Sequence, residues 1–309
     1  MQDLQTQRAA PLEFRLIQGA ETESQFSALL DQGFGLSGGA HYLDDFPIWS
    51  ERFSELKTLR LGIFRGSRLL SAVSLRFATL KTSRSARMAV ALIGAVVTEV
   101  ESRGQGLASQ LIQAATRLAE EGGAAGVFLW ASDHGIYMRH GFLPMGQQWR
   151  VPLEALEFGQ SEPTAEIVVN KGWNPALFHM ICNRPDGLAH SPTDLGWYQA
   201  HKNVCWFWAG SQEAPTAYAA VGRGIDLQNI VHEWGGDSVT LHSLLRELRT
   251  RESSLQLLAT EKLLDKNSLA VRNEDVIVES LCLARPITDE FSKLIAEPES
   301  FWIWGLDAV

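Results

Sequence analysis

The sequence predicts an α/β fold in which helices flank a sheet of mixed parallel and antiparallel strands. Two observations lead to this prediction. Strand-like segments at 59–64, 69–80 and 89–98 follow one another through short connections, as in an antiparallel meander. A helical pattern at 106–121 then separates the third of these strands from another at 127–130, and such a strand–helix–strand unit needs a parallel crossover.

The elements of the first half can be taken in chain order. Residues 89–98 are an almost continuous apolar run rich in β-branched side chains, which is typical of a strand buried on both faces. Residues 106–121 carry apolar side chains at helical spacing, and Gly122 and Gly123 end that helix. The other expected elements are a strand at 14–17, helices at 21–31 and 46–53, a strand at 127–130, a short helix at 135–140 and a strand from Phe142 onward.

The chain has 309 residues, a length that favours two domains. An acidic stretch without clear periodicity, 153–164, is interpreted as a linker between a first domain at 1–152 and a second at 165–309. In the second half the pattern of three strands, a helix and a strand recurs, which we interpret as an internal duplication. The expected elements there are helices at 193–199 and 238–248 and strands at 204–209, 217–222, 227–234, 255–259, 276–283 and 301–304.

Composition excludes several classes of protein. With 45% apolar and 20% charged residues, the chain is neither collagen-like nor disordered. No apolar run reaches the ~20 residues that a membrane span needs, and residues 1–10 lack the apolar core of a signal peptide. Three cysteines without metal-ligand spacing fit a reducing compartment. These observations predict a cytoplasmic protein.

Charge is unevenly distributed along the chain. The net charge of −9 argues against nucleic acid as the main partner. Residues 1–150 carry 15 basic and 14 acidic side chains, whereas residues 151–309 carry 12 and 22. Residues 56–98 hold eight basic side chains and no acidic one, either as solvated positions or as a positive face for an anionic ligand or the acidic second half. Seven of the ten tryptophans lie in the second half, as core packing or as an aromatic wall for a cation.

A glycine-rich turn joins the strand at 89–98 to the helix at 106–121. Its backbone N–H groups and the donors at the helix N-terminus can converge on one point, which favours an anion. Gly104 and Gly106 lack a Cβ, so an anion can approach the backbone closely, and Arg103 can add a charge-assisted contact. The pattern predicts a pyrophosphate site, with a plain strand-to-helix turn as the alternative.

Two motifs in this region resemble those of a known family. Residues 103–108, Arg-Gly-Gln-Gly-Leu-Ala, resemble the Gln/Arg-x-x-Gly-x-Gly/Ala signature of the GNAT superfamily of N-acetyltransferases. Residues 129–142 are similar to that family's fifth strand, its next helix and its Tyr-x-x-x-Gly-Phe ending. The resemblance covers about residues 14–152 and implies a GNAT-type twisted mixed sheet. The second half resembles a degenerate copy that lacks both motifs, so the chain is expected to hold two tandem GNAT-like domains.

The resemblance implies acetyl-CoA as co-substrate. In the family, the fourth strand pairs with the pantetheine arm and splays from its neighbour to leave a V-shaped groove, and the following turn holds the pyrophosphate. Tyr137 matches the tyrosine that can protonate the leaving thiolate. Ser132 stands where the family often has asparagine, so a contact there is open. The implied cofactor-binding residues are Val96, Val97, Thr98, Arg103, Gly104, Gln105, Gly106, Leu107, Ala108, Ser109 and Ser132.

Neither motif implies a general base. Glu99 and Glu101 follow the fourth strand and are candidates, with solvated loop charges as the alternative. Asp133 and His134 are close to Tyr137 in sequence, but Asp133 can equally cap the short helix that follows it.

The second half offers a counterpart of the phosphate turn at 233–237. This loop has two glycines but lacks the signature, and Asp237 is expected to cap a helix and repel a phosphate. We therefore expect a single acetyl-CoA site, in the first half. The adjacent His232 and Glu233 are a poor ligand pattern, and no metal is expected.

The sequence thus supports two functions of different classes. The first is an acetyl-CoA-dependent N-acetyltransferase, in which a primary amine of a small molecule or peptide attacks the thioester directly. The second is a non-catalytic acyl-CoA-binding or scaffold protein, which thioester turnover with a panel of amines would distinguish. Because the second half is acidic, we expect a cationic acceptor, whose identity the sequence leaves open together with the oligomeric state.

Overall fold

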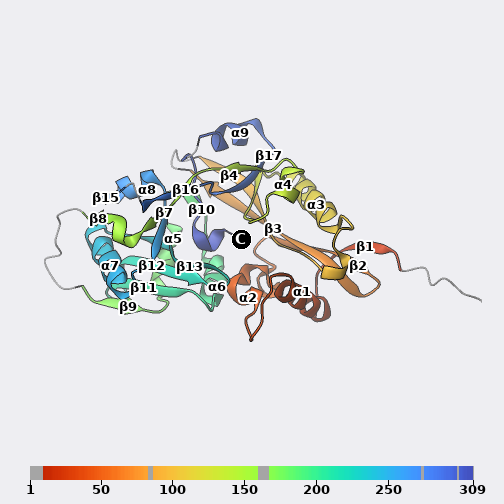
Figure 1. Cartoon of the computed structure of the whole chain (residues 1–309), viewed down its shortest axis with the longest axis horizontal. Helices are drawn as coiled ribbons and strands as arrows, with labels where there is room; N and C mark the ends of the chain where they lie inside the picture. Colours follow the sequence, from red (N-terminus) through yellow and green to blue (C-terminus); the bar gives the residue numbers. More distant parts are fainter. Residues whose placement is uncertain (1–9, 83–85, 159–166, 273–274, 298, 309) are drawn as a thin grey trace, which may run out of the picture.

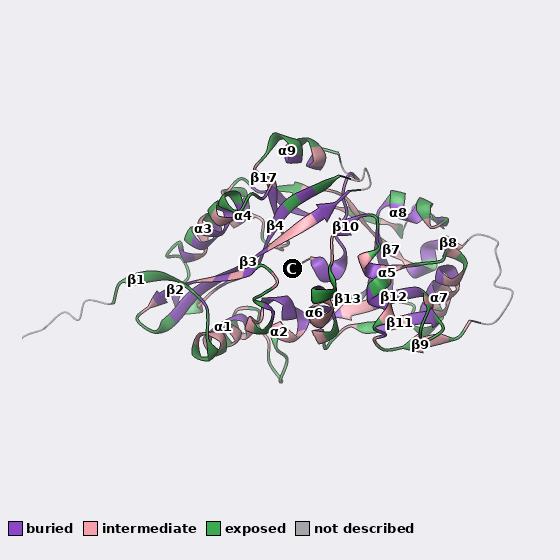
Figure 2. Ribbon diagram, turned by 180° about the vertical axis from the view of Figure 1, so that it is seen from behind, coloured by how far each residue is buried: buried purple, intermediate pink, exposed green. Residues whose placement is uncertain are grey.

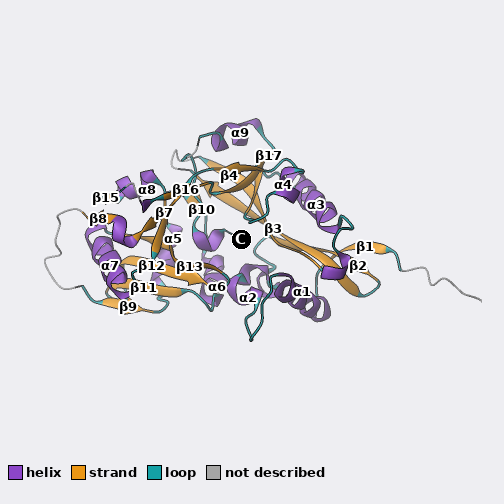
Figure 3. Ribbon diagram, in the orientation of Figure 1, coloured by secondary structure: helices purple, strands orange, loops and turns teal. Residues whose placement is uncertain are grey.

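The computed structural model describes residues 10–82, 86–158, 167–272, 275–297 and 299–308. Two large sheets lie beside each other, with helices packed on both (Figures 1 and 3). The C-terminal segment runs between them and ends near the centre of the molecule. The helices within the described residues are all too short or too polar to cross a membrane.

The first sheet has eight strands and contains the predicted meander. Its order is β1-β2-β3-β4-β5-β17-β6, and β10 adds to β3. Only β4 and β5 pair in parallel; the other neighbours are antiparallel, which confirms the predicted mixed sheet. The strands are β1 (Leu12–Leu16), β2 (Thr58–Arg65), β3 (Arg68–Lys81), β4 (Arg87–Thr98), β5 (Gly126–Leu129), β6 (Leu143–Met145), β10 (Gly187–Leu188) and β17 (Cys282–Pro286).

Helices cover both faces of this sheet. On one face, α3 (Leu107–Glu121) buries Leu111, Ile112 and Ala115 against side chains of β2, β3 and β4, including Ile63. On the other face, α1 (Ala20–Gly33) buries Phe26, Leu29 and Leu30 in a cluster that continues into the second sheet. Because β4 is covered on both faces, nearly all of its central side chains are buried, as the apolar run predicts. The segment predicted as one helix at 46–53 instead forms α2 (Tyr42–Asp45) and the 3₁₀ turns Pro47–Trp49 and Glu51–Phe53.

The second sheet repeats the same local order of elements. Three antiparallel strands lead through α7 to β14, which pairs in parallel with β13, just as α3 joins β4 to β5. The sheet order is β16-β7-β14-β13-β12-β11-β9. Its elements are β7 (Gln148–Pro152), β9 (Val169–Lys171), β11 (Cys205–Gly210), β12 (Pro215–Arg223), β13 (Asp226–Gly236), α7 (Ser238–Arg251), β14 (Gln256–Ala259) and β16 (Ile277–Glu279).

The two sheets exchange strands across the predicted domain boundary at residue 152. β7, which precedes that boundary, pairs with β14 and β16 in the second sheet. β17, from the far end of the chain, pairs with β5 and β6 in the first sheet. The prediction of one strand at 276–283 was wrong, because the run is two strands in different sheets. The chain crosses between the sheets at Ser280 and Leu281.

The short helices predicted at 135–140 and 193–199 are present, whereas the other short elements had no clear sequence signal. Residues 301–304, predicted as a strand, are buried but form no strand. The predicted linker begins with a 3₁₀ turn and β8, and its remainder, 159–164, lies outside the described residues. The additional elements are α4 (Gly135–Met138), β8 (Leu156–Phe158), α5 (Ala176–Cys182), α6 (Leu195–Ala200), α8 (Glu261–Lys266), β15 (Leu269–Val271) and α9 (Asp289–Ile295).

A buried polar network holds the C-terminal segment between the sheets. Asp307 is fully buried and accepts hydrogen bonds from Arg76 Nη1 at 3.3 Å and His190 Nε2 at 3.0 Å. Arg223 Nη1 donates to the carbonyls of Gly305 and Ala308 at 2.7 and 2.6 Å. Burial alone would raise the pKa of Asp307, but His190 and Arg76 outweigh it and hold that pKa below its usual value. The carboxylate is therefore ionised and links β3 to the C-terminal segment.

Asp307→Ala should lower the free energy of unfolding by about 3–5 kcal/mol, because the buried Arg76 then keeps only the more distant Asp194 carboxylate, at 3.9 Å, as a counter-charge. Urea unfolding followed by fluorescence measures this change. Arg251→Ala is the matched control, since it breaks the exposed Arg251–Glu247 pair of α7, and its cost should be about 0–1 kcal/mol. Equal effects of the two substitutions would contradict a structural role for Asp307.

Candidate functional site

The site begins where β4 and β5 stop pairing. The parallel pairs are Ala91–Val127, Leu92–Phe128 and Ile93–Leu129, and β5 ends there while β4 continues to Thr98. On the other side of β4, the register with β3 shifts between Ala72 and Ser74. The extra residue is accommodated with Ala95 in a left-handed conformation, φ 51°. Beyond this bulge, the β5-facing edge of β4 has no strand partner among the described residues.

The turn after β4 presents open backbone. Gly104 and Gly106 have φ values of 77° and 75°, and a Cβ built on either would meet no atom within 4 Å. α3 begins at Leu107, so its unpaired N–H groups face the same space. Arg103 Nε donates to the Thr98 carbonyl at 3.2 Å, which holds this side chain at the end of β4. The geometry is that of an anion cradle at a helix N-terminus.

A pocket of about 780 Å³ lies over this turn and is here called the turn pocket. The structure brings the predicted cofactor-binding residues together around it with one exception, because Gln105 does not line the pocket. Ser109 Oγ lies 2.6 Å from His140 Nε2 at its edge, a contact that sequence reasoning missed. The lining residues that the sequence predicted are Val96, Val97, Thr98, Arg103, Gly104, Gly106, Leu107, Ala108, Ser109, Ser132 and Tyr137.

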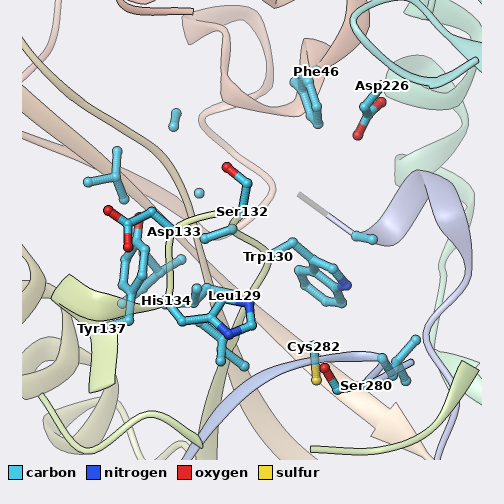
Figure 4. Close-up of a pocket in the computed structure, with 18 of the residues that line it drawn as sticks. Phe46, Leu129, Trp130, Ser132, Asp133, His134, Tyr137, Asp226, Ser280 and Cys282 are labelled. Carbon is cyan, nitrogen blue, oxygen red and sulfur yellow. The ribbon is translucent and has the colours of Figure 1, made fainter. Parts of the chain in front are cut away.

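A second pocket, of about 910 Å³, lies between the two sheets and is here called the inter-sheet pocket. It is lined by the ends of β4 and β5 and by residues of the second sheet, among them Gln148, Asp226 and Glu279. Both pockets are bounded by Phe34, Val96, Ser132, Asp133, Ile136 and Tyr137. They therefore meet at Tyr137 and form one bent groove, and Figure 4 shows its inter-sheet part.

Tyr137 stands at the junction of the two pockets. It lies on α4, and only 9% of the residue is exposed. Burial raises the pKa of Tyr137 to about 12, and the neighbouring Asp133 carboxylate adds to the effect. Figure 4 shows Asp133 and Tyr137 together on one wall. The phenol is consequently protonated throughout the neutral range and can donate a proton to an atom at the junction.

The carboxylates of the inter-sheet pocket differ in their partners. Asp226 receives two hydrogen bonds from Arg223, at 2.8 and 2.5 Å, and its charge is neutralised. Glu279 accepts a hydrogen bond from Gln148 Nε2 at 2.7 Å, and no cationic side chain among the described residues pairs with it. Glu279 is thus a carboxylate available to a charged ligand.

Aromatic rings form another wall of the inter-sheet pocket. Tyr42 lies between Phe34 and Phe46, with ring centroids 4.5 Å apart on each side. The Arg223 guanidinium lies 4.3 Å from the centre of the Phe46 ring and ends the column. Figure 4 shows Phe46 and Asp226 across the pocket from Cys282 and Ser280, with Trp130 between. Sequence analysis did not single out the residues of this column.

The tryptophans of the second half do not line either pocket. Trp197, Trp206, Trp208, Trp234, Trp302 and Trp304 are buried in the core, which supports the packing interpretation. Trp173 is only partly buried and packs edge-on against Trp206. The inter-sheet pocket takes its tryptophan, Trp130, from the first half of the chain.

The structure shows where the candidate general bases lie and which partners they have. Glu99 is paired with Arg68 and accepts a hydrogen bond from Ser102 Oγ at 3.1 Å, and neither Glu99 nor Glu101 lines a pocket. Asp133 Oδ1 accepts the Gly135 N–H at 2.8 Å, at the start of α4. Its other oxygen, Oδ2, accepts no hydrogen bond among the described residues. Asp133 and His134 both line the inter-sheet pocket, so both stay in the groove as candidates.

The second half lacks an equivalent of the anion cradle. Asp237 accepts the Thr240 N–H at 3.1 Å and caps α7, as predicted, so a carboxylate occupies the start of that helix. His232 and Glu233 are fully buried, with Glu233 paired to Arg184. No group of three potential metal ligands occurs in the part of the chain that the structure describes.

Comparison with known proteins identifies relatives of this fold. The acetyltransferase (GNAT) domain model matches residues 13–145. No curated protein sequence matches the chain. A GCN5-related N-acetyltransferase from Anabaena variabilis aligns with a TM-score of 0.63 at 16% identity, over 90% of this chain and 73% of its own. One from Kribbella flavida aligns with a TM-score of 0.61 at 17% identity, over 89% and 71%. A structure from Pyrococcus horikoshii aligns with a TM-score of 0.57 at 11% identity, over 100% and 99%, so the fold is shared along the whole chain.

Gly106→Asp should abolish binding of coenzyme A, because a carboxylate would project into the open space of the turn pocket. Isothermal calorimetry measures the loss, and the parent chain should bind one equivalent. Gly123→Asp is the matched control, since Gly123 has φ 78° with equally open space but lies at the other end of α3. Retained binding in Gly106→Asp, or a stoichiometry of two in the parent, would contradict the single site.

Proposed function

We propose that the chain is an acetyltransferase of the GNAT family, whose domain model matches residues 13–145, and that it transfers an acetyl group from acetyl-CoA to a primary amine. The observation that carries the proposal is the bent groove, in which an anion cradle and a pocket between the sheets meet at a buried, protonated tyrosine. The turn pocket suits a phosphorylated carrier, and the inter-sheet pocket suits a separate acceptor.

The turn pocket has the features that coenzyme A needs. The open backbone at Gly104 and Gly106 and the N–H groups of α3 can hold a pyrophosphate. The unpaired edge of β4 at Val96–Thr98 can hydrogen-bond the amide groups of a pantetheine arm, as a neighbouring strand would. The bound acetyl-CoA would supply the activated acetyl thioester at the junction of the pockets.

Tyr137 and Asp133 are the groups placed to move protons. The acceptor nitrogen must lose a proton before it attacks, and Asp133 Oδ2 is a carboxylate oxygen at the junction that can accept it. As the carbon–sulfur bond breaks, the Tyr137 hydroxyl donates its proton to the leaving thiolate. The phenolate regains a proton from the nitrogen through solvent, and Asp133 releases its proton to solvent. Of the two protons that the ammonium group loses, one therefore ends on the thiol and one in solvent.

The lining of the inter-sheet pocket supports a proposal for the acceptor class. Glu279 offers a carboxylate without a cationic partner among the described residues, and Trp130 and the Tyr42 column offer ring faces. We therefore propose a cationic amine of a small molecule or peptide as the acceptor, recognised through Glu279. The net charge of the second half is a weaker argument, because its acidic side chains are distributed over the whole of that half.

The basic segment 56–98 does not form a positive face for the coenzyme's phosphates at the turn pocket. None of its described basic side chains lines the turn pocket. Arg76 pairs with Asp307 and Asp194 of the second half, and Lys81 donates to the carbonyls of Cys182 and Arg184. For these two residues, the positive charge serves contact with the second half of the chain.

Tyr137→Phe should lower kcat by about 10²–10⁴-fold with little change in the KM for acetyl-CoA, because the proton is donated only as charge develops on sulfur. Steady-state kinetics by thiol release measures both constants. Tyr42→Phe is the matched control: it removes a hydroxyl from the same groove and should change kcat by only a few-fold. Unchanged turnover in Tyr137→Phe would remove Tyr137 from the mechanism. Absence of turnover in the parent with every amine tested would favour the non-catalytic acyl-CoA-binding alternative.

Glu279→Gln should raise the KM for a polyamine by roughly tenfold and reduce its dependence on salt, because one desolvated carboxylate–ammonium contact is lost. The same substitution should change the KM for an amine that also carries a carboxylate, already a poor acceptor, by less than tenfold. Glu261→Gln makes the identical charge change at an exposed position of α8 and is the control. Equal effects of the two variants would assign recognition to diffuse charge instead of Glu279.

A further inference from the structure

The outer edge of β1 is an unused hydrogen-bonding surface. β1 is the first strand of the first sheet, paired with β2 on one side and with no strand on the other among the described residues. It lies at the end of the molecule remote from the second sheet (Figure 1). An exposed strand edge of this kind can template a further strand.

The backbone groups on that edge can be identified from the register. Ile17 N–H donates to the Arg60 carbonyl at 2.9 Å, and the β1–β2 register has no shift from Leu12 to Leu16. In an antiparallel pair, hydrogen-bonded positions alternate along each strand. Glu13, Arg15 and Ile17 are therefore the positions bonded to β2. The N–H and C=O groups of the residues between them point away from the sheet.

The side chains of these outward-bonding residues are apolar and exposed. Leu12, Phe14 and Leu16 are 41%, 52% and 45% exposed, and Figure 2 shows β1 as an exposed strand. All three alternate onto the same face, which is the α3 face, because Phe14 lies opposite Ile63 of the α3-side core. A run of exposed apolar side chains beside free backbone donors and acceptors indicates a surface that is covered in the assembled protein.

We propose that β1 pairs antiparallel with β1 of a second copy of this chain, about a twofold axis at Phe14, so that the two first sheets become continuous. Phe14 of one copy then lies opposite Phe14 of the other, and Leu12 lies opposite Leu16. All of these are outward-bonding positions, so the free edges satisfy each other. The apolar residues of both strands merge into one strip between the two α3 helices.

The opposite face of the strand is complementary in charge. In this register Glu13 of one copy faces Arg15 of the other, twice by symmetry, and unlike charges directly opposite stabilise a strand pair. A parallel, in-register pairing would instead place Glu13 against Glu13. Both the backbone alternation and the charge pattern select the antiparallel twofold arrangement, which is the self-complementary form expected of a symmetric dimer.

The assembly is tested by measuring the mass of the full chain in solution across a concentration series. The parent should sediment at twice 34.2 kDa. Phe14→Pro removes an N–H that β2 does not use, and proline is tolerated on such an edge. It should raise the dimer dissociation constant by about tenfold or more, with the transition temperature of the monomer little changed. Phe14→Ala keeps the N–H and separates the contribution of the ring.

Charge exchange tests the register independently of folding. Glu13→Arg and Arg15→Glu should each weaken the homodimer, because like charges then meet across the twofold axis. Mixed together, these two variants should form a heterodimer, in which every facing pair is again complementary. A parent that stays at 34.2 kDa at all concentrations would overturn the proposal. So would a dimer that survives Phe14→Pro and both charge reversals unchanged, since another surface would then hold it.

Discussion

The groove depends on one constraint, the separation of two parallel strands. β4 and β5 pair through three residues each and then diverge, and the bulge at Ala95 turns the end of β4 away from its former neighbour. A buried strand edge normally finds a hydrogen-bond partner, so this divergence leaves an edge that a ligand can complete. The turn, the helix N-terminus and Tyr137 all lie around the resulting opening.

The second sheet contributes the part of the groove that the first sheet lacks. Glu279, Gln148 and Asp226 come from three strands of the second sheet, and they line a pocket whose other side is the end of β4 and β5. Local partners decide what each charge can do there. Asp226 is neutralised by Arg223, whereas Glu279 is held by an amide and keeps its charge for a ligand. The position and pairing of single carboxylates therefore carry more information than the net charge of a segment.

The residues that the sequence singled out lie together in the structure where they are contiguous in the chain. Residues 96–109 form one stretch in which a strand and a helix of clear periodicity flank the turn, and nine of the ten residues predicted there line the turn pocket. Ser132, from a separate loop, also lines it. Glu279 and Tyr42 could not be found in this way, because long-range packing brings them together. The error at 276–283 has the same origin. A segment of that length with mostly apolar residues looks like one strand, and only pairing with β5 and β7 divides it between two sheets.

The strand exchange has a consequence for how the chain acquires its structure during synthesis. The N-terminal half leaves the ribosome first, yet the first sheet lacks a strand between β5 and β6 until residues 282–286 have been made. β7 must likewise wait for β14 before its edge is paired. Closing such distant pairs is slow, because the entropy of a long loop is lost before the contacts form. The two halves are thus committed to folding together, and neither sheet can be completed as an independent unit.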